Sequence, residues 1–496
     1  MSTLPAGAAA EERNSSRMAD EPMSEELPGE DVPARPRRPG QAGRFGSLAL
    51  VVLVALCGVT LLLGFLNKDR CAGPEFNKDG RSDPDFDMRS KQDVCYSDIQ
   101  FLWLGRDIDK HVFPYVDGKL TAGGLPVGGV VEYPVLTGLI IWASALFANT
   151  DAQFLLSSAL VLAPFGLFTA WLLGKLSRWR ALLWAIGPPL VMYAFHNWEL
   201  PVVACAVAAV YVVHRGWGRR GADRPLLTRA TAAAVLLGLG FAFKVYPAIF
   251  VLPLMLYVLT GGRREGDDRR APDWLGAIRV GAAALGTAVL VNVPFALVGF
   301  EGLKASFIFQ LQRKADITTN SIWFWGLRPY SDPDNKPVQE LIGVLSPTLM
   351  LLSFVIACAL GWRRYVKEGT YPWVAVSAAM LCGFLLLHKV HSPQYTLWLV
   401  PMFVLLRIKW GWILAYFVAD LAMGIGIFRW YYEIFYGKHG GIYDGLAAQA
   451  VMVGVWGRAF LLVGLFYAFL TTSSTVDDDP PLPDSPPGER PALANS

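Results

Sequence analysis

Long apolar runs alternate with short polar loops over most of the chain. Many of these runs can cross a hydrocarbon core about 30 Å thick, and the charged residues fall almost entirely between them. The pattern predicts about twelve membrane-spanning helices, to within one, because several runs are shorter than the usual ~20 residues. The expected spans are Gly46–Leu66, Gln153–Leu173, Ala181–Phe195, Leu200–Val213, Ala230–Phe243, Tyr246–Leu259, Val280–Phe300, Leu345–Leu360, Tyr371–Leu387, Tyr395–Leu406, Gly411–Phe428 and Gln449–Leu470.

Two of these regions contain helix-breaking residues. One carries Ile186-Gly187-Pro188-Pro189, and the other carries Lys244-Val245-Tyr246-Pro247 between two apolar runs. Proline removes a backbone donor and clashes with the preceding turn, so we expect kinked or discontinuous helices at both places.

Composition agrees with a membrane protein. Of 496 residues, 53% are hydrophobic and only 17% are charged, which is too little polar surface for a soluble protein of this size. The sequence therefore predicts an all-α, polytopic membrane protein. The formal net charge of +3 is too small to favour a nucleic-acid partner.

The distribution of Lys and Arg predicts the orientation. Basic residues gather in alternate loops, for example Lys175–Arg180 and Arg363–Lys367, and these loops should be cytoplasmic. The polar segments between them should lie outside, including the long external loop 67–152. Residues 1–45 and 472–496 are low-complexity and are expected to be disordered cytoplasmic tails around a membrane domain of residues 46–471.

Cysteine placement separates two groups. Four cysteines lie in apolar spans and are expected to be buried small hydrophobic residues. Cys71 and Cys95 both lie in the external loop, where a disulfide is chemically permitted, and two unpaired thiols are the alternative.

The segment CYSDIQFLWLGRDIDKH, residues 95–111, places an acid beside an aromatic stretch in the external loop. A carboxylate at the lipid headgroup level can take the proton of a hydroxyl nucleophile, so Asp98 is a candidate general base. The structural alternative is a helix N-cap, since Ser97 and Asp98 are both favoured there.

Two helices of this loop are expected to lie at the membrane surface. Ile99–Leu104 is aromatic and partly amphipathic. Val135–Phe147 is apolar, but if it crossed the membrane the basic loop Lys175–Arg180 would lie outside, against the charge rule. We interpret it as an interfacial or re-entrant helix.

Three external turns carry further candidate chemistry. Lys244 sits at a break between spans, where an ammonium could bind a phosphate, although snorkelling to the surface is the alternative. His388, Lys389 and His391 favour phosphate or sugar contacts over a zinc site, because no third zinc ligand is evident. His196, Asn197 and Glu199 offer groups for sugar hydroxyls, and an exposed turn would have a similar composition.

The external segment Glu301–Pro347 mixes aromatic residues with amides and cations. Among them are Gln310, Arg313 and Trp323. Such a mixture suits carbohydrate, because sugar C–H faces rest on rings while hydroxyls find polar partners, and it is also typical of an interfacial aromatic belt.

Taken together, these segments resemble a known family. YSDIQFLW, FPYVDG and VEYPVLTGLIIW resemble the first external loop of the GT-C membrane glycosyltransferases, and most of all glycosyltransferase family 87, the polyprenyl-phosphomannose-dependent α-mannosyltransferases. FKVYPAIFVLPL is similar to the Lys-x-x-Pro segment of that family. HKVHSPQYTLWLVP is similar to its late external turn and to that of the first mannosyltransferase of GPI-anchor synthesis. The resemblance covers roughly residues 46–470.

The resemblance implies roles for individual residues. Asp98 would be the catalytic base, and the donor phosphate would be bound by Lys244, His388, Lys389 and His391. Substrate contacts would come from Tyr133, His196, Asn197, Glu199 and Gln394.

The resemblance also implies partners: a sugar on a polyprenyl phosphate as donor, a glycan or glycolipid acceptor in the cell envelope, and transfer with inversion on the outer face. Mannose is the expected sugar, with arabinose or another hexose as alternatives. Some relatives carry Asp-x-Asp where this chain has Asp98 and Gln100; Asp107 and Asp109 have that spacing but lack the aromatic context. No cofactor is assigned, and a divalent cation stays open.

Two other functions fit the same pattern. A transporter or flippase for lipid-linked saccharides would also need many spans and broken helices, and it predicts charge near the bilayer midplane, for which Asp420 is the candidate. An inactive scaffold for envelope assembly is the third interpretation. The gathering of unusual residues on one membrane face favours transfer chemistry.

Overall fold

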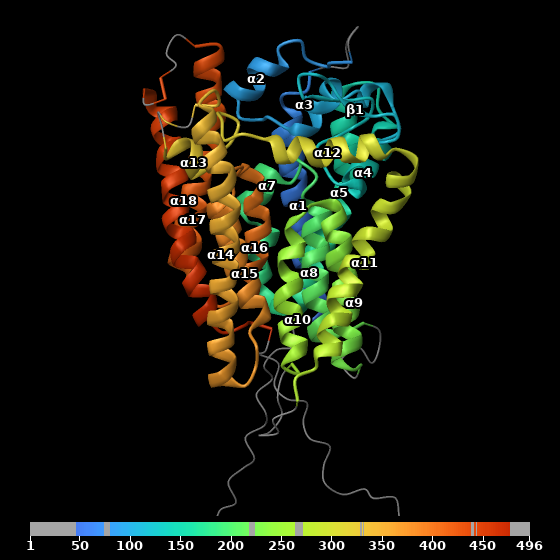
Figure 1. Cartoon of the computed structure of the whole chain (residues 1–496). Coiled ribbons are helices and arrows are strands. Elements are labelled where there is room, and N and C mark those ends of the chain that lie inside the picture. Colours follow the sequence, from blue (N-terminus) through green and yellow to red (C-terminus); the bar gives the residue numbers. More distant parts are fainter. Residues whose placement is uncertain are drawn as a thin grey trace, which may run out of the picture. The chain divides into compact units, whose positions relative to one another are not determined.

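The structure is a computed structural model that describes residues 46–73, 80–217, 224–262, 271–327, 330, 332–437, 441–442 and 444–476 (Figure 1). The chain divides into two units, Met1–Arg44 and Phe45–Ser496, and all described residues belong to the second. The tail predicted at residues 1–45 lies outside the described residues. Of the tail predicted at 472–496, only residues 472–476 are described.

Seven helical stretches in the described part of the chain are long and apolar enough to cross a membrane. The chain is therefore a multi-pass membrane protein. The seven are α1 (Ser47–Asp69), the continuous stretch of α5, η2 and α6 (Asp151–Ala185), α9 (Leu226–Phe243), α11 (Trp274–Val298), α14 (Lys336–Glu368), α17 (Trp410–Phe435) and α18 (Gly445–Thr471).

The remaining predicted spans form shorter helices. They are helical over most of their length, but the predicted count of about twelve crossings is not confirmed, because several are too short to span a bilayer alone. These helices are α7 (Pro188–Tyr193), α8 (Leu200–Arg215), η3 (Tyr246–Phe250) with α10 (Val251–Leu259), α15 (Trp373–Leu387) and α16 (Thr396–Leu405).

Proline accounts for the expected breaks. α5 (Asp151–Ser177) continues through η2 (Arg178–Ala181) into α6 (Leu182–Ala185), which ends before Pro188, the first residue of α7. α9 ends at Phe243, and Pro247 lies in the 3₁₀ turn η3 that follows. A proline at the start of a helix costs nothing, since its missing N–H would be unpaired there, but it stops a helix that precedes it.

The remaining elements gather at one end of the bundle, the upper end in Figure 1. The two short strands pair antiparallel, with Lys119 opposite Val127. The elements are α2 (Phe86–Gln92), α3 (Asp98–Gly105), η1 (Ile108–Lys110), β1 (Lys119–Leu120), β2 (Pro126–Val127), α4 (Val135–Ala145), α12 (Phe300–Gln312), α13 (Ile322–Trp325) and η4 (Pro393–Tyr395).

α3 and α4 are the two segments expected to lie at the membrane surface. Both are helical, and their position relative to a bilayer stays a prediction. α4 packs closely on the loop before it: a Cβ on Gly138 would lie 2.1 Å from the Tyr115 hydroxyl, so only glycine fits. That hydroxyl donates to the Tyr133 carbonyl at 2.8 Å and holds the start of α4 in place.

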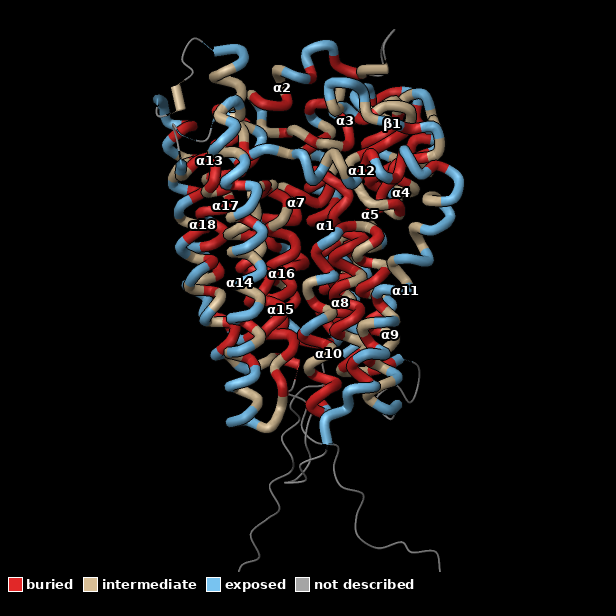
Figure 2. The backbone as a smooth tube through the Cα atoms, in the orientation of Figure 1, coloured by how far each residue is buried: buried red, intermediate tan, exposed pale blue. Residues whose placement is uncertain are grey.

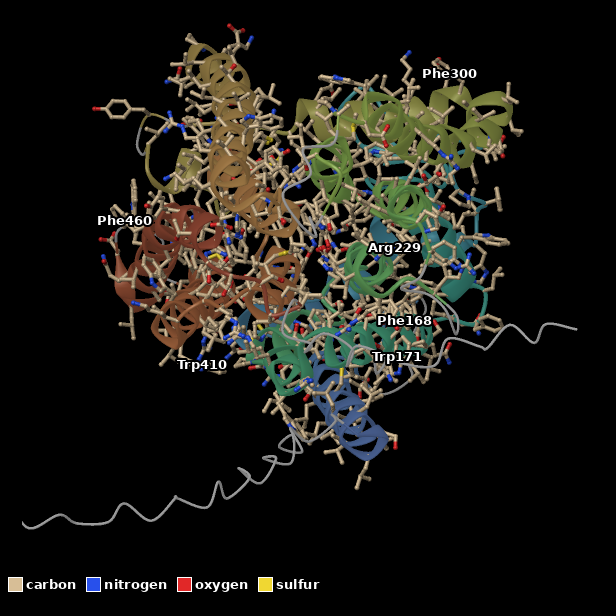
Figure 3. All side chains as sticks on the ribbon, turned by 90° about the horizontal axis from the view of Figure 1, so that it is seen from below. Phe168, Trp171, Arg229, Phe300, Trp410 and Phe460 are labelled. Atoms are coloured by element: carbon tan, nitrogen blue, oxygen red, sulfur yellow. A yellow bond between two sulfur atoms is a disulfide. The ribbon has the colours of Figure 1, made fainter. Side chains whose placement is uncertain are left out.

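Burial follows the arrangement expected in a bilayer. Figure 2 shows buried segments at the centre, while α14 and α18 are largely exposed along their outer sides. Large apolar side chains point outward around the bundle (Figure 3), among them Trp410, 63% exposed, and Phe460, 71% exposed. In water such a surface would be costly, but lipid tails cover it without penalty.

A disulfide joins Cys71 to Cys95, the pair that the sequence left open. It ties the residues after α1 to the segment that leads into α3. Around it, the Lys68 ammonium donates to the Tyr96 carbonyl at 2.8 Å, and Arg89 donates to the Arg70 carbonyl at 2.8 Å. The first membrane helix and the residues before Asp98 are therefore held together both covalently and by hydrogen bonds.

The opposite ends of the helices carry the basic loops predicted to be cytoplasmic. Arg180 donates to the carbonyls of Phe403 and Leu406 at 2.8 and 3.0 Å. Arg364 donates to the Leu470 carbonyl at 3.1 Å, at the end of α18. These arginines cap helix ends whose carbonyl groups lack intrahelical partners. Their side of the membrane stays a prediction.

Replacing Cys71 and Cys95 by serine should destabilise the protein. Opening a 24-residue loop restores chain entropy to the unfolded state, worth about 3 kcal/mol. We expect the thermal midpoint in detergent to fall by roughly 5 °C. The matched control is Cys205→Ser with Cys358→Ser, two cysteines outside the disulfide. Equal midpoints, or complete alkylation of Cys71 and Cys95 without reduction, would contradict the assignment.

Candidate active site

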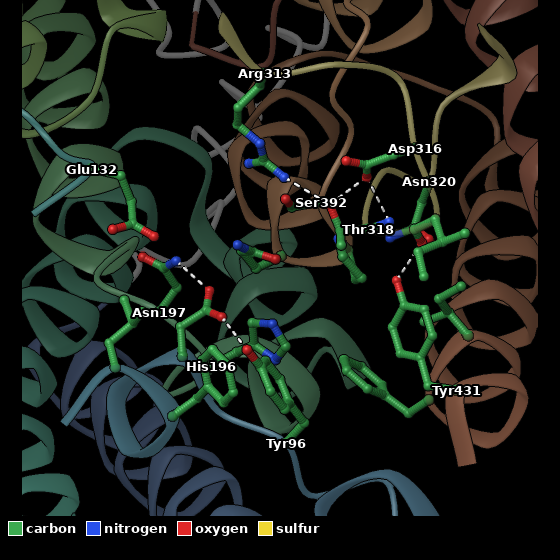
Figure 4. A pocket seen from close by; sticks show the side chains of 18 of the residues that line it. Tyr96, Glu132, His196, Asn197, Arg313, Asp316, Thr318, Asn320, Ser392 and Tyr431 are labelled. Carbon is green, nitrogen blue, oxygen red and sulfur yellow. Dashed lines mark hydrogen bonds between the residues drawn. The ribbon is translucent and has the colours of Figure 1, made fainter. Parts of the chain in front are cut away.

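A cavity of about 950 Å³ opens at the end of the bundle that carries α2, α3 and α12 (Figure 4). Segments far apart in the sequence line it together. They contribute, among others, Asp98, Tyr133, Lys244, Arg313 and Gln394. A cavity of this size accepts a sugar with part of a second molecule.

Asp98 is the first residue of α3, and its carboxylate is free of the capping role. Ser97 is the N-cap instead: its hydroxyl oxygen accepts from the Ile99 N–H at 3.2 Å and donates to the Phe195 carbonyl at 2.7 Å. The Asp98 N–H donates to the His196 carbonyl at 2.8 Å. Of the two residues proposed as the N-cap, Ser97 caps the helix and Asp98 faces the cavity.

Two side chains hold the Asp98 carboxylate. The Tyr96 hydroxyl donates to Oδ1 at 2.9 Å, and the Asn197 Nδ2 donates to Oδ2 at 2.7 Å, as Figure 4 shows. Desolvation raises the pKa of the Asp98 carboxyl, and these two hydrogen bonds oppose that rise only in part. A raised pKa makes the carboxylate a stronger base, which suits proton removal from a hydroxyl.

Asn197 positions Asp98 and has no capacity left for a substrate. Its Nδ2 donates both hydrogens, to Asp98 and to the Tyr133 hydroxyl at 2.8 Å. Its Oδ1 accepts from the Trp198 N–H at 2.6 Å and from the Lys244 ammonium at 3.1 Å. All four hydrogen-bonding sites of the amide are occupied, so the predicted sugar contact by this side chain is replaced by a positioning role.

Lys244 lines the cavity, but its charge is already compensated. The ammonium forms a buried ion pair with Glu199, whose other oxygen accepts from the Trp398 indole at 2.6 Å. Lys244 also lies 5.0 Å from the ring centre of Tyr133. A phosphate would have to displace Glu199 to gain the full charge of Lys244, and Glu199 itself is bound to Lys244 and Trp398 and is absent from the cavity lining.

Arg313 and Lys314 are the cavity cations without a carboxylate partner in the described residues, and of the two only Arg313 can offer paired N–H groups to an anion. Lys91 pairs with Asp87 at 2.5 Å, and Arg106 pairs with Glu132 at 2.7 Å. Within the described residues Arg313 has no carboxylate partner, and its guanidinium donates to the Thr318 hydroxyl at 3.2 Å. In Figure 4 Arg313 and Thr318 lie on one side of the cavity, and Tyr96 and Asn197 on the other.

Several polar atoms in the cavity wall are left for a ligand. Gln394 Oε1, Asn320 Oδ1 and His196 Nδ1 are buried and have no hydrogen-bond partner in the part of the chain that the structure describes. Burial, with Lys68 and Lys244 nearby, lowers the pKa of His196, so its ring is neutral. Such unpaired groups cost free energy unless a ligand or water satisfies them, and sugar hydroxyls can do so.

His388, Lys389 and His391 lie outside the lining of the cavity. His391 is buried, with Nδ1 on the Leu385 carbonyl at 2.9 Å and Nε2 accepting from Arg458 at 2.8 Å. Lys389 donates to the Leu311 carbonyl at 3.1 Å. Both ring nitrogens of His391 already have partners inside the bundle. We therefore do not assign this cluster to the phosphate site.

Asp420, the candidate midplane charge of a transporter, is likewise engaged. It accepts from the Thr396 hydroxyl at 2.5 Å and pairs with Arg458 at 3.4 Å, and both side chains of the pair are buried. This network joins α17 and α18 to the helix that begins beside the cavity. Its charges are satisfied inside the protein, as membrane proteins require.

The described residues contain no group of three His, Cys, Asp or Glu side chains arranged to hold a metal ion. Gln100, which stands where some relatives have a second aspartate, is fully buried in α3 and does not line the cavity. Asp107 accepts from the Gly128 N–H at 3.0 Å, and neither it nor Asp109 lines the cavity. The divalent cation therefore stays open as a cofactor.

Two residues of the site were given no specific role from the sequence. Tyr96 directly precedes the Ser97-Asp98 pair, and its hydroxyl donates to Asp98, a contact that no pattern in the sequence marks. Arg313 was one of several polar residues in a long external segment. Its lack of a carboxylate partner is a property of the fold and has no sequence signal.

Comparison with known proteins adds a family match. A family model described as Mannosyltransferase (PIG-M) matches residues 197–436, a range that contains Asn197, Lys244, Arg313 and Gln394. GPI mannosyltransferase 1 of Saccharomyces cerevisiae is 24% identical over 383 residues, which cover 73% of this chain and 88% of the yeast protein. GPI mannosyltransferase 1 of Eremothecium gossypii is 24% identical over 331 residues, covering 62% and 75%.

One solved structure is also similar. ArnT from Cupriavidus metallidurans, bound to undecaprenyl phosphate, has a TM-score of 0.40 and 14% identity, covering 86% of this chain and 77% of that one. At that score the likeness supports no conclusion about the site. The chain is thus similar to GPI mannosyltransferase 1 over most of its length, and this similarity does not single out glycosyltransferase family 87.

Proposed function

We propose that this chain is a GT-C-type membrane mannosyltransferase that transfers mannose from a polyprenyl phosphate to a hydroxyl of a cell-envelope glycan or glycolipid. The observation that carries the proposal is the Asp98 carboxylate, fixed by Tyr96 and Asn197 in the wall of a large cavity. The similarity to GPI mannosyltransferase 1 supports mannose as the sugar. Arabinose is the alternative to be tested beside it.

The proposed reaction is a single inverting displacement. The acceptor hydroxyl oxygen attacks the anomeric carbon of the donor sugar while its proton passes to Asp98. The bond between that carbon and the phosphate oxygen breaks, and the electron pair leaves with the polyprenyl phosphate. Asp98 would contribute about 10²–10⁴-fold as a general base.

Arg313 is proposed to stabilise the departing phosphate. Its guanidinium has no competing carboxylate among the described residues, and it can offer two parallel N–H groups to phosphate oxygens. Such a donor is most effective when charge develops on the leaving group. Lys244, paired with Glu199, would instead hold Asn197 and Tyr133 in place.

Sugar recognition is assigned to the unpaired polar atoms and rings of the wall. Gln394 Oε1 and Asn320 Oδ1 would accept hydroxyl hydrogens, and the faces of Tyr395 and Tyr431 would support the sugar ring. The disulfide close to Asp98 supports placing this end of the bundle on the oxidising, external side.

Asp98→Asn should abolish transfer without loss of protein. The amide keeps the shape of the carboxylate but cannot accept the proton, so we expect turnover to fall about 10²–10⁴-fold. Purified protein would be incubated with mannosyl and arabinosyl polyprenyl phosphates and with lipid acceptors, and release of polyprenyl phosphate would be followed together with the new glycoside.

The matched control for this variant is Asp109→Asn, which removes a carboxylate from the same loop outside the cavity. Normal turnover by Asp98→Asn would defeat the assignment of the base. Wild-type protein that moves lipid-linked sugar between leaflets without making a glycoside would favour a flippase, and neither activity would favour a scaffold.

Tyr96→Phe should shift the pH dependence of turnover. The lost hydrogen bond stabilised the charged carboxylate, so the pKa of Asp98 should rise further above its ordinary value. Because a base works only when deprotonated, activity is lost as pH falls through this pKa. The acid limb of kcat/KM against pH should move to higher pH by up to about one unit. An unchanged acid limb would show that the pKa governing turnover is not that of Asp98.

Arg313→Gln should impair use of the donor. Loss of a charge-assisted bond to the leaving phosphate is expected to lower kcat/KM for the donor by about 10–100-fold, with a smaller effect on the acceptor KM. Lys304→Gln is the control, because it removes an exposed cation of α12 outside the cavity. Similar kinetics for the two variants would remove Arg313 from the phosphate site.

A further inference from the structure

A second cavity, about 420 Å³ in volume, lies between α1 and α17 on the other side of the segment that leads to Asp98. Asp87, Lys91 and Tyr96 line the large cavity, whereas Gln92, Asp93 and Val94 line this one. The segment from α2 to Tyr96 therefore separates the two cavities. The proposed transfer chemistry uses only one of them.

The walls of this second cavity come from two membrane spans and a short helix. Asn67 and Arg70 belong to the end of α1, Ile425 and Arg429 belong to α17, and Met192 lies in α7 between them. α7 has only six residues, so it borders the cavity over a short distance along the two spans.

A glycine of α1 lies against the backbone of α7, and a glycine of α17 lies against the Tyr193 side chain of α7. A Cβ on Gly64 of α1 would lie 3.1 Å from the Leu190 carbonyl oxygen, and a Cβ on Gly424 of α17 would lie 2.3 Å from the Tyr193 hydroxyl. α7 therefore lies beside α1, and its Tyr193 side chain reaches α17.

Two guanidinium groups stand in the cavity. Arg70 donates from Nε to the Asn67 carbonyl at 3.0 Å and from Nη2 to the Asp93 carbonyl. Arg429 donates from Nη1 to the Gln92 carbonyl at 2.6 Å. Each has N–H groups beyond these contacts, and neither pairs with a carboxylate in the described residues.

The one acid in the lining does not cancel this charge. Asp93 lies 3.8 Å from Arg89, a cation outside the lining, and its single negative charge is smaller than the charge of the two arginines. Arg70 directly follows α1 and Arg429 lies in the last two turns of α17, and guanidinium groups without a carboxylate partner among the described residues can bind phosphate oxygens in pairs.

An apolar stripe leads from the cavity along each span. On α17, Ile425 is 44% exposed and Val418, seven residues earlier on the same face, is also exposed. On α1, Leu63 lies one turn below Asn67 and is half exposed. Cations at the level where the spans end, with exposed apolar side chains beneath them, match the two halves of a phospholipid.

We infer that this cavity binds one anionic glycerophospholipid, with its phosphate between Arg70 and Arg429 and one acyl chain along the exposed apolar side chains of α1 and α17. The inference does not depend on the transfer reaction. Because Gln92–Val94 form its roof, the bound headgroup also braces the segment that carries Tyr96 and Asp98.

Delipidated protein in detergent would be mixed with phosphatidylglycerol, phosphatidylcholine or a polyprenyl phosphate, and retained lipid would be counted by native mass spectrometry. The wild type should retain one phosphatidylglycerol in preference to either other lipid. Arg70→Gln with Arg429→Gln should lose this retention by about tenfold. Lys119→Gln with Lys304→Gln, two exposed cations outside the cavity, should behave as the wild type.

Ile425→Trp tests the acyl-chain contact separately, because a larger side chain would fill part of the cavity while both arginines stay in place. It should also lose phosphatidylglycerol while its thermal midpoint stays near that of the wild type. Retention by either the arginine variant or the tryptophan variant would overturn the inference. Equal retention of phosphatidylcholine, or preferential retention of the polyprenyl phosphate, would do the same.

Discussion

Four hydrogen bonds meet on the side-chain amide of Asn197, and the arrangement of the large cavity depends on them. Through its nitrogen Asn197 binds Asp98 and Tyr133, and through its oxygen it binds Lys244. Lys244 is in turn paired with Glu199. Because every donor and acceptor of the amide is used, its orientation is fixed, and the carboxylate of Asp98 is fixed with it. Three segments distant in sequence are thereby held in one register.

This network explains why charged groups can be buried here at tolerable cost. A lysine or a glutamate alone in a bilayer-level interior would be strongly unfavourable, but paired and hydrogen-bonded they compensate each other. The same logic holds for a second buried network, in which Arg458 binds both Asp420 and His391. The Asn197 network borders the cavity and positions Asp98, and the Asp420 network joins α16, α17 and α18. Polar residues in membrane helices therefore divide between these two uses, and sequence position alone does not tell which.

Much of the fold could be predicted from the sequence. Apolar runs predicted the helices, and prolines 188 and 247 predicted the breaks at α7 and η3, because periodicity and helix-breaking are local properties. The number of crossings could not be predicted, because a short apolar helix such as α16 has the same composition as part of a spanning helix, and only its packing against neighbours distinguishes the two. Asp98, Tyr133, Lys244 and Gln394 were found because each stands in a distinctive local context, and all four line the cavity. His391 has the same kind of context but turns toward Arg458, and Arg313 was not distinguished, because pairing across the fold leaves no local signal.

The short helices have a consequence for how this protein is made. α7, α10 and α16 contain six, nine and ten residues, too few to remain in a bilayer by their own hydrophobicity. Each must be retained by longer neighbours, some of which are synthesised later. The long spans can therefore enter the membrane as they are made, whereas each short helix becomes stably placed only after its longer neighbours have been synthesised.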